Sequence, residues 1–174
     1  MNEKQEKFKN YLSQPPYIIS KQLELYLSEN SAYRKMNLMV NVFTQVTRYW
    51  GCIFLCDYLS TNESDQKVNN AIRKLLRPSL GCWKEFVYSY VKFSKSNGFV
   101  TNALELFEKA DSLKLNPPFG DSTRTVRPFD AFIHFRNHLA HGGIIPNEIQ
   151  SAAYIEFYEP YLFHIIDSFL PFFD

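Results

Sequence analysis

AYRKMNLMVNVFTQVTRYWGCIFLCDYL, residues 32–59, is the stretch that decides the fold. Its apolar residues recur at steps of three and four, which places them on one face of an α-helix. The series comprises Met36, Met39, Val40, Phe43, Val46, Trp50, Ile53 and Phe54. At about 1.5 Å per residue, such a helix would be about 40 Å long. We therefore expect it to form the spine of a helical bundle.

Helical periodicity continues on both sides of this segment, and before it Ile19, Leu23 and either Tyr26 or Leu27 would share one stripe. Further helices are expected over residues 2–12, 19–30, 66–76, 83–98, 100–113, 128–141 and 147–172, with a bend at Pro160 and with Gly98 closing the fourth of them. Residues 114–126 form the longest irregular stretch, and the chain contains neither an internal repeat nor a long linker. The pattern predicts one all-α domain over residues 1–174, an antiparallel helical bundle.

Composition narrows the class of protein further. The chain has 174 residues with 16 Phe, 11 Tyr and 2 Trp against only 6 Gly, which argues against a many-stranded β protein. So many rings can fill a large core or a self-association seam. P-loop, GxGxxG, HExxH and nucleophile-elbow motifs are missing from the sequence.

Charge is distributed unevenly along the chain. All 19 Lys and Arg lie within residues 1–136, whereas the last 38 residues carry five acids and no basic residue apart from histidine. Any anion-binding surface must therefore come from the first three-quarters of the chain. The C-terminal helix is expected to be mostly buried or to face a partner.

The cysteines and the N-terminus indicate a cytoplasmic protein. Three cysteines without a secretory signal point to a reducing compartment, and no apolar run reaches the roughly 20 residues that a membrane helix needs. Cys52 and Cys56 lack a second ligand pair, so we expect core packing and no metal site or cofactor. His164 is expected to be a core histidine with its hydrogen bonds satisfied.

FDAFIHFRNHLAHGG, residues 129–143, carries the chemistry. With about 100° between successive residues, an apolar face of this helix would have Arg136 at its middle, among Phe129, Phe132, Ile133, Leu139 and Ala140. A neighbouring polar stripe would hold Asp130, His134, Asn137 and His141. Two imidazoles, an amide and a carboxylate differ from the Lys- and Glu-rich face that usually meets solvent.

Structural roles would also account for these residues. His141 could cap the helix C-terminus, where a cation is favoured by the helix dipole. Asp130 and His134 could form a local pair four residues apart. Arg136 could spread its aliphatic stem over apolar rings.

The string Arg136-Asn137-His138-Leu139-Ala140-His141-Gly142 closely resembles the R-x4-6-H motif of HEPN domains, whose typical form is RN-x-x-A-H-G. The resemblance implies an HEPN-like helical homodimer in which Arg136 and His141 of both subunits meet in one cleft. Many members of the family are metal-independent endoribonucleases that act as toxins or phage-defence effectors. In that reading His141 transfers protons, Arg136 stabilises charge on the phosphate, and Asn137 orients the His141 imidazole or the phosphate. Arg124, Arg127, His134 and His138 would contact the RNA.

Two features favour a second reading. A toxin branch of the family has a tyrosine where this chain has Gly143, so control by the matching antitoxin would be lost. The turn RPSLGCW, residues 77–83, resembles N-terminal modules of larger bacterial signalling and defence proteins. The alternative is therefore a non-catalytic dimerisation or sensor module, excised from a longer protein and controlled by a fused or associated regulatory domain.

Overall fold

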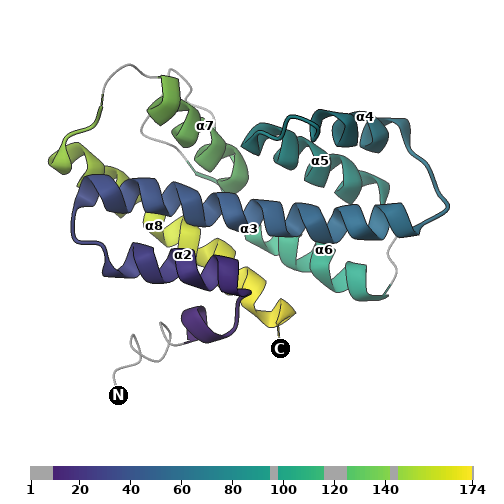
Figure 1. The fold of residues 1–174 in the computed structure, drawn as a ribbon, viewed down its shortest axis with the longest axis horizontal. Helices are drawn as coiled ribbons and strands as arrows, with labels where there is room; N and C mark the ends of the chain where they lie inside the picture. Colours follow the sequence, from purple (N-terminus) through teal and green to yellow (C-terminus); the bar gives the residue numbers. More distant parts are fainter. Residues whose placement is uncertain (1–9, 95–97, 116–124, 142–144, 174) are drawn as a thin grey trace.

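The computed structural model describes residues 10–94, 98–115, 125–141 and 145–173, and it confirms an all-α fold (Figure 1). The helices are α2 (Tyr17–Ser28), α3 (Ala32–Ser60), α4 (Gln66–Lys74), α5 (Leu80–Phe93), α6 (Gly98–Ala110), α7 (Pro128–His141) and α8 (Glu148–Phe169), followed by the 3-10 turn η1 (Leu170–Phe172). Helix α3 runs the length of the molecule as predicted, with α4, α5 and α7 on one side of it and α2 on the other.

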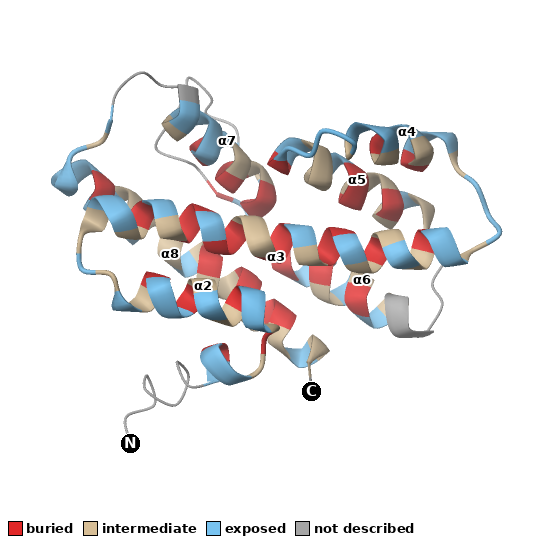
Figure 2. Ribbon diagram, in the orientation of Figure 1, coloured by how far each residue is buried: buried red, intermediate tan, exposed pale blue. Residues whose placement is uncertain are grey.

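The buried face of α3 is the predicted stripe. Seven of its eight residues are buried and Ile53 is half-buried, and α3 packs against α2, α5 and α8 (Figure 2). On α2 the corresponding stripe is Ile19, Leu23 and Tyr26, with Leu27 only half-buried. Spacing alone was sufficient here because each helix has one continuous apolar face.

Aromatic rings fill the interior of a single protomer. Around Trp50 the ring centroids of Phe169, Phe54 and Phe172 lie at 4.8, 5.6 and 5.7 Å. Of the aromatic residues whose side chains are described, only Tyr17 and Tyr33 are exposed. The aromatic excess is therefore no argument for a self-association seam, because one core buries most of it.

Several helix ends follow ordinary capping rules. Asp65 opens α4 by accepting from the amides of Lys67 and Val68 at 2.8 and 3.0 Å. Asn147 and Gln150 form a capping box at the start of α8, which then continues through the exposed Pro160. The predicted helix end at Gly98 is wrong, because α5 ends at Phe93 and Gly98 is the first residue of α6.

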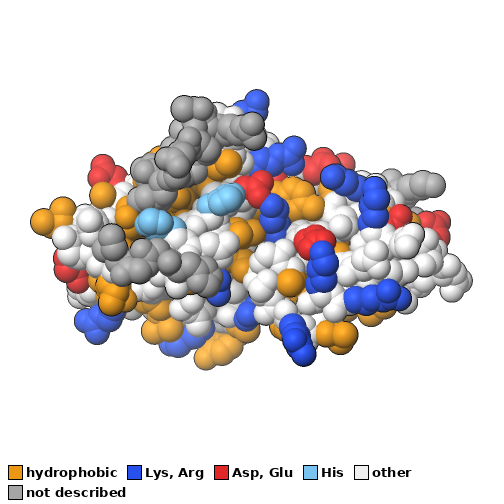
Figure 3. All heavy atoms as spheres, turned by 90° about the horizontal axis from the view of Figure 1, so that it is seen from above, with side chains coloured by type: hydrophobic (Ala, Val, Ile, Leu, Met, Phe, Trp, Pro, Cys, Tyr) orange, Lys and Arg blue, Asp and Glu red, His pale blue; other side chains and the backbone are white. Residues whose placement is uncertain are grey.

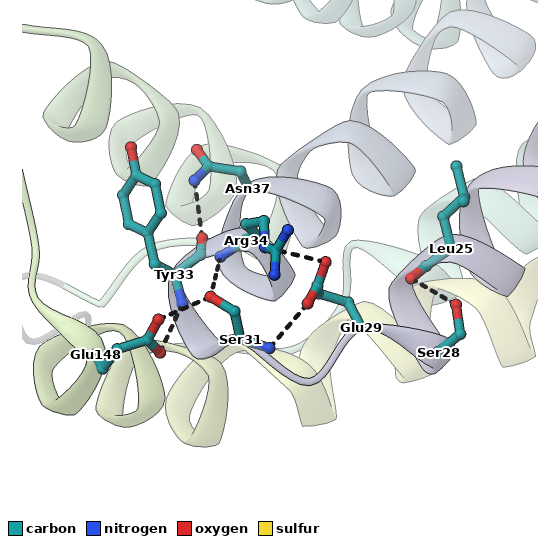
Figure 4. A network of polar contacts seen from close by, with 8 residues as sticks. All are labelled: Leu25, Ser28, Glu29, Ser31, Tyr33, Arg34, Asn37 and Glu148. Atoms are coloured by element: carbon teal, nitrogen blue, oxygen red, sulfur yellow. Dashed lines mark hydrogen bonds and ion pairs between the residues drawn. The ribbon is translucent and has the colours of Figure 1, made fainter.

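The segment that follows the motif helix is tied to the start of α3 (Figure 4). Ser31 donates its hydroxyl to Glu148 at 2.7 Å, and the amide of Tyr33 donates to the same carboxylate at 3.2 Å. The bond from Ser31 is the main cause that lowers the pKa of Glu148. Glu29, on the other side of Ser31, pairs with Arg34. These contacts fix where the chain re-enters the bundle after α7.

The two ends of the stretch predicted to be irregular, residues 114–126, are paired with each other. Leu115 and Val126 form an isolated antiparallel bridge with two N–O distances of 2.8 Å, and residues 116–124 lie outside the described part. Within that described part, none of the helices combines the length and apolarity needed to cross a membrane.

Gly51 allows α5 to lie close to α3. A methyl group at this buried glycine would overlap the ring of Trp83, whereas one at Gly81 would meet nothing nearer than Ser79 Oγ at 3.7 Å. We expect Gly51→Ala to lower the free energy of unfolding by about 1–3 kcal/mol through overpacking. Gly81→Ala is the matched control and should gain up to about 1 kcal/mol from helix propensity. Thermal melts compare the two, and a stabilised Gly51→Ala would contradict the packing described.

Candidate functional site

Three phenylalanines orient the motif helix α7. Phe129, Phe132 and Phe135 are all buried. Phe132 stacks on Phe43 of α3 with centroids 4.5 Å apart, and Phe135 stacks on Tyr158 of α8 at 4.3 Å. Because these rings contribute most of the apolar surface of α7, they decide which side of the helix faces the core.

The predicted position of Arg136 at the middle of the apolar face is wrong. Arg136 is exposed, as is Ala140, which was assigned to that face. The buried face is turned by roughly 60° from the predicted one, toward Phe135, which the prediction had left out. Burying a phenylalanine ring outweighs burying Ala140, so the helix turns Arg136 out to solvent.

Asp111 anchors the start of α7. Its side chain, only 3% exposed, lies directly after α6 and accepts hydrogen bonds from three donors. These are the hydroxyl of Tyr88, the amide of Phe129 at 3.3 Å and Arg127 Nη1 at 3.4 Å. The amide of Phe129 belongs to the first turn of α7, where helix amides lack internal partners. Asp111 thus caps α7 from the end of α6 and places a negative charge at the favourable end of the α7 dipole.

The pKa of Asp111 is raised, chiefly because the carboxylate is buried. The hydrogen bonds from Tyr88 and Phe129 and the charge of Arg127 act in the opposite direction and lower it. Arg127 was predicted to contact RNA, and its side chain is 63% exposed. Part of its charge is nevertheless committed to Asp111.

A second ion pair joins α7 to α5. Lys84 pairs with Asp130, and its ammonium group also lies 5.1 Å from the ring centroid of Tyr88. The local pair between Asp130 and His134 that the spacing suggested is therefore replaced by a pair between helices. Lys84 lies three residues from Gly81 and four from Tyr88, so one face of α5 is directed toward α7.

The predicted site residues are distributed along the outer surface of α7. His134, Arg136, Asn137 and His138 are all exposed. Arg136 Nη1 donates to Asn137 Oδ1 at 3.2 Å, so the amide predicted to orient a histidine or a phosphate holds the guanidinium. The side chain of His141 and the whole of Arg124 lie outside the described residues.

A hollow lined by described residues lies beside α7, between α4 and α5, with a volume of about 780 Å³. Its lining includes Arg127, Asp130 and Ile133 on the side of α7 and Lys67, Lys84 and Lys92 on the other side. Sequence reasoning missed these three lysines. The signal was the spacing of Lys84, Tyr88 and Lys92 at four-residue steps, which places them on one face of α5. Figure 3 shows this side of the molecule, where histidine, Lys and Arg side chains gather.

Two expectations about other residues are corrected or refined. Cys52 and Cys56 are exposed on α3 and do not pack in the core, because the buried stripe runs through Gly51 and Phe54 instead. Across the described residues, no group of three or more His, Cys, Asp and Glu is placed to hold a metal ion. His164 is half-buried and its Nε2 lies 3.1 Å from the carbonyl of Lys109, so its polar contact is satisfied at the edge of the core.

Comparison with protein-family models, with curated proteins and with solved structures finds no match for this chain. The site must therefore be interpreted from its own geometry and from the motif.

Neighbouring residues on α7 provide a matched test of its orientation. Arg136→Ala should change the free energy of unfolding by less than about 0.5 kcal/mol, because the side chain is exposed. Phe135→Ala should cost about 3–5 kcal/mol, because its ring is stacked in the core. Thermal or urea melts measure both values. Equal losses in the two variants would mean that Arg136 packs inside the protein.

Asp111→Asn tests the anchor of α7. At neutral pH the loss should be about 1–3 kcal/mol, since an amide cannot accept from all three donors. The raised pKa means that the folded protein binds the Asp111 proton more tightly than the unfolded chain does. The stability that Asp111 gains from this proton is fully present below about pH 3.9, the pKa of an aspartate in the unfolded chain. It is lost as the pH rises through the raised pKa of Asp111 in the folded protein. The difference in free energy of unfolding between wild type and Asp111→Asn should therefore narrow from about pH 4 upward.

Urea melts across this pH range measure the gap. Glu108→Gln is the control, because Glu108 is an exposed acid in the last turn of α6, three residues before Asp111. A gap that widens with rising pH would contradict the direction assigned to the Asp111 pKa.

Proposed function

We propose that this chain is a metal-independent endoribonuclease that cuts single-stranded or looped RNA through attack of a ribose 2′-OH. The observation that carries the proposal is the exposure of Arg136 on the surface of α7, where Asn137 holds its guanidinium. His134 and His138 are exposed on the same helix. A guanidinium buried among rings could not reach a phosphate. An exposed one has donors left for phosphoryl oxygens.

The proposed reaction needs only a proton carrier and charge stabilisation. The 2′-oxygen bonds to phosphorus while its proton is taken up, and the bond from phosphorus to the 5′-oxygen breaks as that oxygen gains a proton. His141 serves these transfers near neutral pH. Arg136 stabilises the charge that builds on the phosphoryl oxygens. Asn137 holds the guanidinium in position, as its 3.2 Å hydrogen bond indicates.

We further propose that the enzyme is a homodimer with the motif helix and the start of α8 in its seam. Ile145 and Ile149 are 78% and 82% exposed, just after the motif. Large apolar side chains that are exposed beside a polar site suit an interface that covers them. A toxin or phage-defence role, and control by a regulatory domain or by an antitoxin that does not need the tyrosine replaced by Gly143, rest on the motif resemblance alone. The proposed cytoplasmic location rests on the three cysteines.

One observation favours the second candidate, a non-catalytic dimerisation or sensor module of a larger defence protein. The hollow beside α7 reaches Asp130 and Ile133, but Arg136 is not part of its lining. This hollow therefore does not enclose the guanidinium. Catalysis requires that a second subunit supply the other wall.

Cleavage of RNA in chelator tests the proposal. The purified protein should cut a single-stranded RNA in EDTA, leave products with 2′,3′-cyclic phosphate and 5′-hydroxyl ends, and spare DNA, which lacks the nucleophile. His141→Ala should lose a factor of about 10²–10⁴ in rate. Arg136→Ala should lose a similar factor, and Asn137→Ala should be milder. Product ends are identified by mass spectrometry.

Mixing two inactive variants separates a shared cleft from a site within one subunit. If Arg136 of one subunit works with His141 of the other, mixed dimers of Arg136→Ala and His141→Ala regain cleavage, because one complete pair remains. Light scattering checks that the dimer forms. Strict dependence on magnesium, or full activity in His141→Ala, would rule out the mechanism, and a wild type that cuts nothing would favour the module.

A further inference from the structure

The hollow between α4, α5 and α7 is built as an elongated groove. Along α5 its lining runs from Gly81 to Phe93 in steps of three and four, so one face of that helix forms the floor. At about 1.5 Å per residue this floor is about 18 Å long. Helix α4 contributes one side and α7 the other. A single phosphate ion would occupy only part of this length.

The acidic side chains of the groove have partners, whereas two of its lysines have no ion-pair partner among the described residues. Each of its three carboxylates already has a partner: Asp65 caps the amides of α4, Glu85 pairs with Lys74 at 2.5 Å, and Asp130 pairs with Lys84. Lys67 and Lys92 also line the groove, and no described carboxylate forms an ion pair with either. The groove therefore has an excess of positive charge with two ammonium groups available to a ligand.

Aromatic and apolar groups lie between these charges. Tyr88 and Phe93 are half-buried and line the groove, together with Ile133 from α7. The Tyr88 ring is held by its hydroxyl bond to Asp111 and by Lys84 near its face. Fixed rings beside ammonium groups are the combination that single-stranded nucleic acids use, because bases stack on rings while phosphates meet cations.

The groove is continuous with the motif and with two adjoining hollows. Asp130 lines it, and His134 and Asn137 follow on the same stripe of α7. A hollow of about 420 Å³ shares Tyr88, Lys92 and Arg127 with the groove and adds Lys114. A third of about 540 Å³ shares Lys67 and extends to Lys74. A chain lying in the groove would thus pass from basic side chains toward Asn137, the residue that holds the Arg136 guanidinium.

We propose that this groove binds the backbone of single-stranded RNA over several nucleotides and positions the strand for the motif of α7. The inference rests on the proposed function, and it assigns substrate positioning to Lys67 and Lys92, away from Arg136. Double-stranded RNA would not present unstacked bases to Tyr88 and Phe93. The positioning lysines lie on α4 and α5, so substrate binding and chemistry can be separated by substitution.

Fluorescence anisotropy with a non-cleavable probe tests the groove. The probe is a labelled 2′-O-methyl RNA of about 12 nucleotides, within the size range of known single-strand sites. Lys67→Glu with Lys92→Glu should weaken binding about tenfold or more and reduce the slope of log K against log salt by roughly 1.4. Lys21→Glu with Arg48→Glu is the control. It has the same charge change at exposed positions outside the groove and should stay within about twofold of wild type.

The outcomes distinguish the groove from the reaction. Arg136→Ala should still bind the probe but no longer cut RNA. If the wild-type protein binds the probe and never cuts RNA, only the proposed ribonuclease activity is refuted. Cleavage and binding that survive in the Lys67/Lys92 variant refute only the groove. Tighter binding of a free mononucleotide than of the probe would also overturn it. Circular dichroism checks the fold of each variant. If Lys67→Glu with Lys92→Glu fails to fold, the charge-neutralising pair Lys67→Gln with Lys92→Gln is used instead.

Discussion

The carboxylate of Asp111 is the constraint on which the candidate site depends. A carboxylate that is almost fully withdrawn from water is costly unless its oxygens accept hydrogen bonds, and here the donors come from α5, from the residue before α7 and from the first turn of α7 itself. Satisfying one buried group therefore fixes the relative positions of three elements. The place where α7 begins follows from an electrostatic requirement as well as from packing.

Orientation of α7 about its own axis has a separate cause. Phe132 and Phe135 stack on rings from α3 and α8, and no rotation of the helix could keep both contacts while burying Arg136. The anchor at Asp111 and the stacked rings act on different degrees of freedom, namely position and rotation. Together they present Arg136 and Asn137 to solvent without any contact that serves only those two residues.

Periodicity predicted what depends on a single helix and missed what depends on two. The α3 stripe, the α2 stripe and the approximate extent of the helices could be read from spacing, because each reflects one helix facing one core. The rotation of α7 could not, since it depends on which rings of α3 and α8 are available to stack. Asp130 illustrates the same limit: a partner four residues away was visible in the sequence, but Lys84 lies 46 residues earlier. The groove, which three helices share, left only the spacing of its lysines as a signal.

The uneven distribution of charge acquires a physical meaning in the folded chain. Basic residues end at Arg136, and helices α4 and α5 carry the lysines of the groove, whereas α8 is acidic where it is charged. An exposed Arg136 loses little solvation free energy when it binds a phosphate. The net free energy of binding is also small, because water competes for every hydrogen bond that the guanidinium makes. One such contact cannot hold an RNA strand at useful affinity. In the proposed groove, several phosphates bound along α5 would supply the missing free energy, and the proposed chemistry on α7 would need only to act on a strand that is already in place.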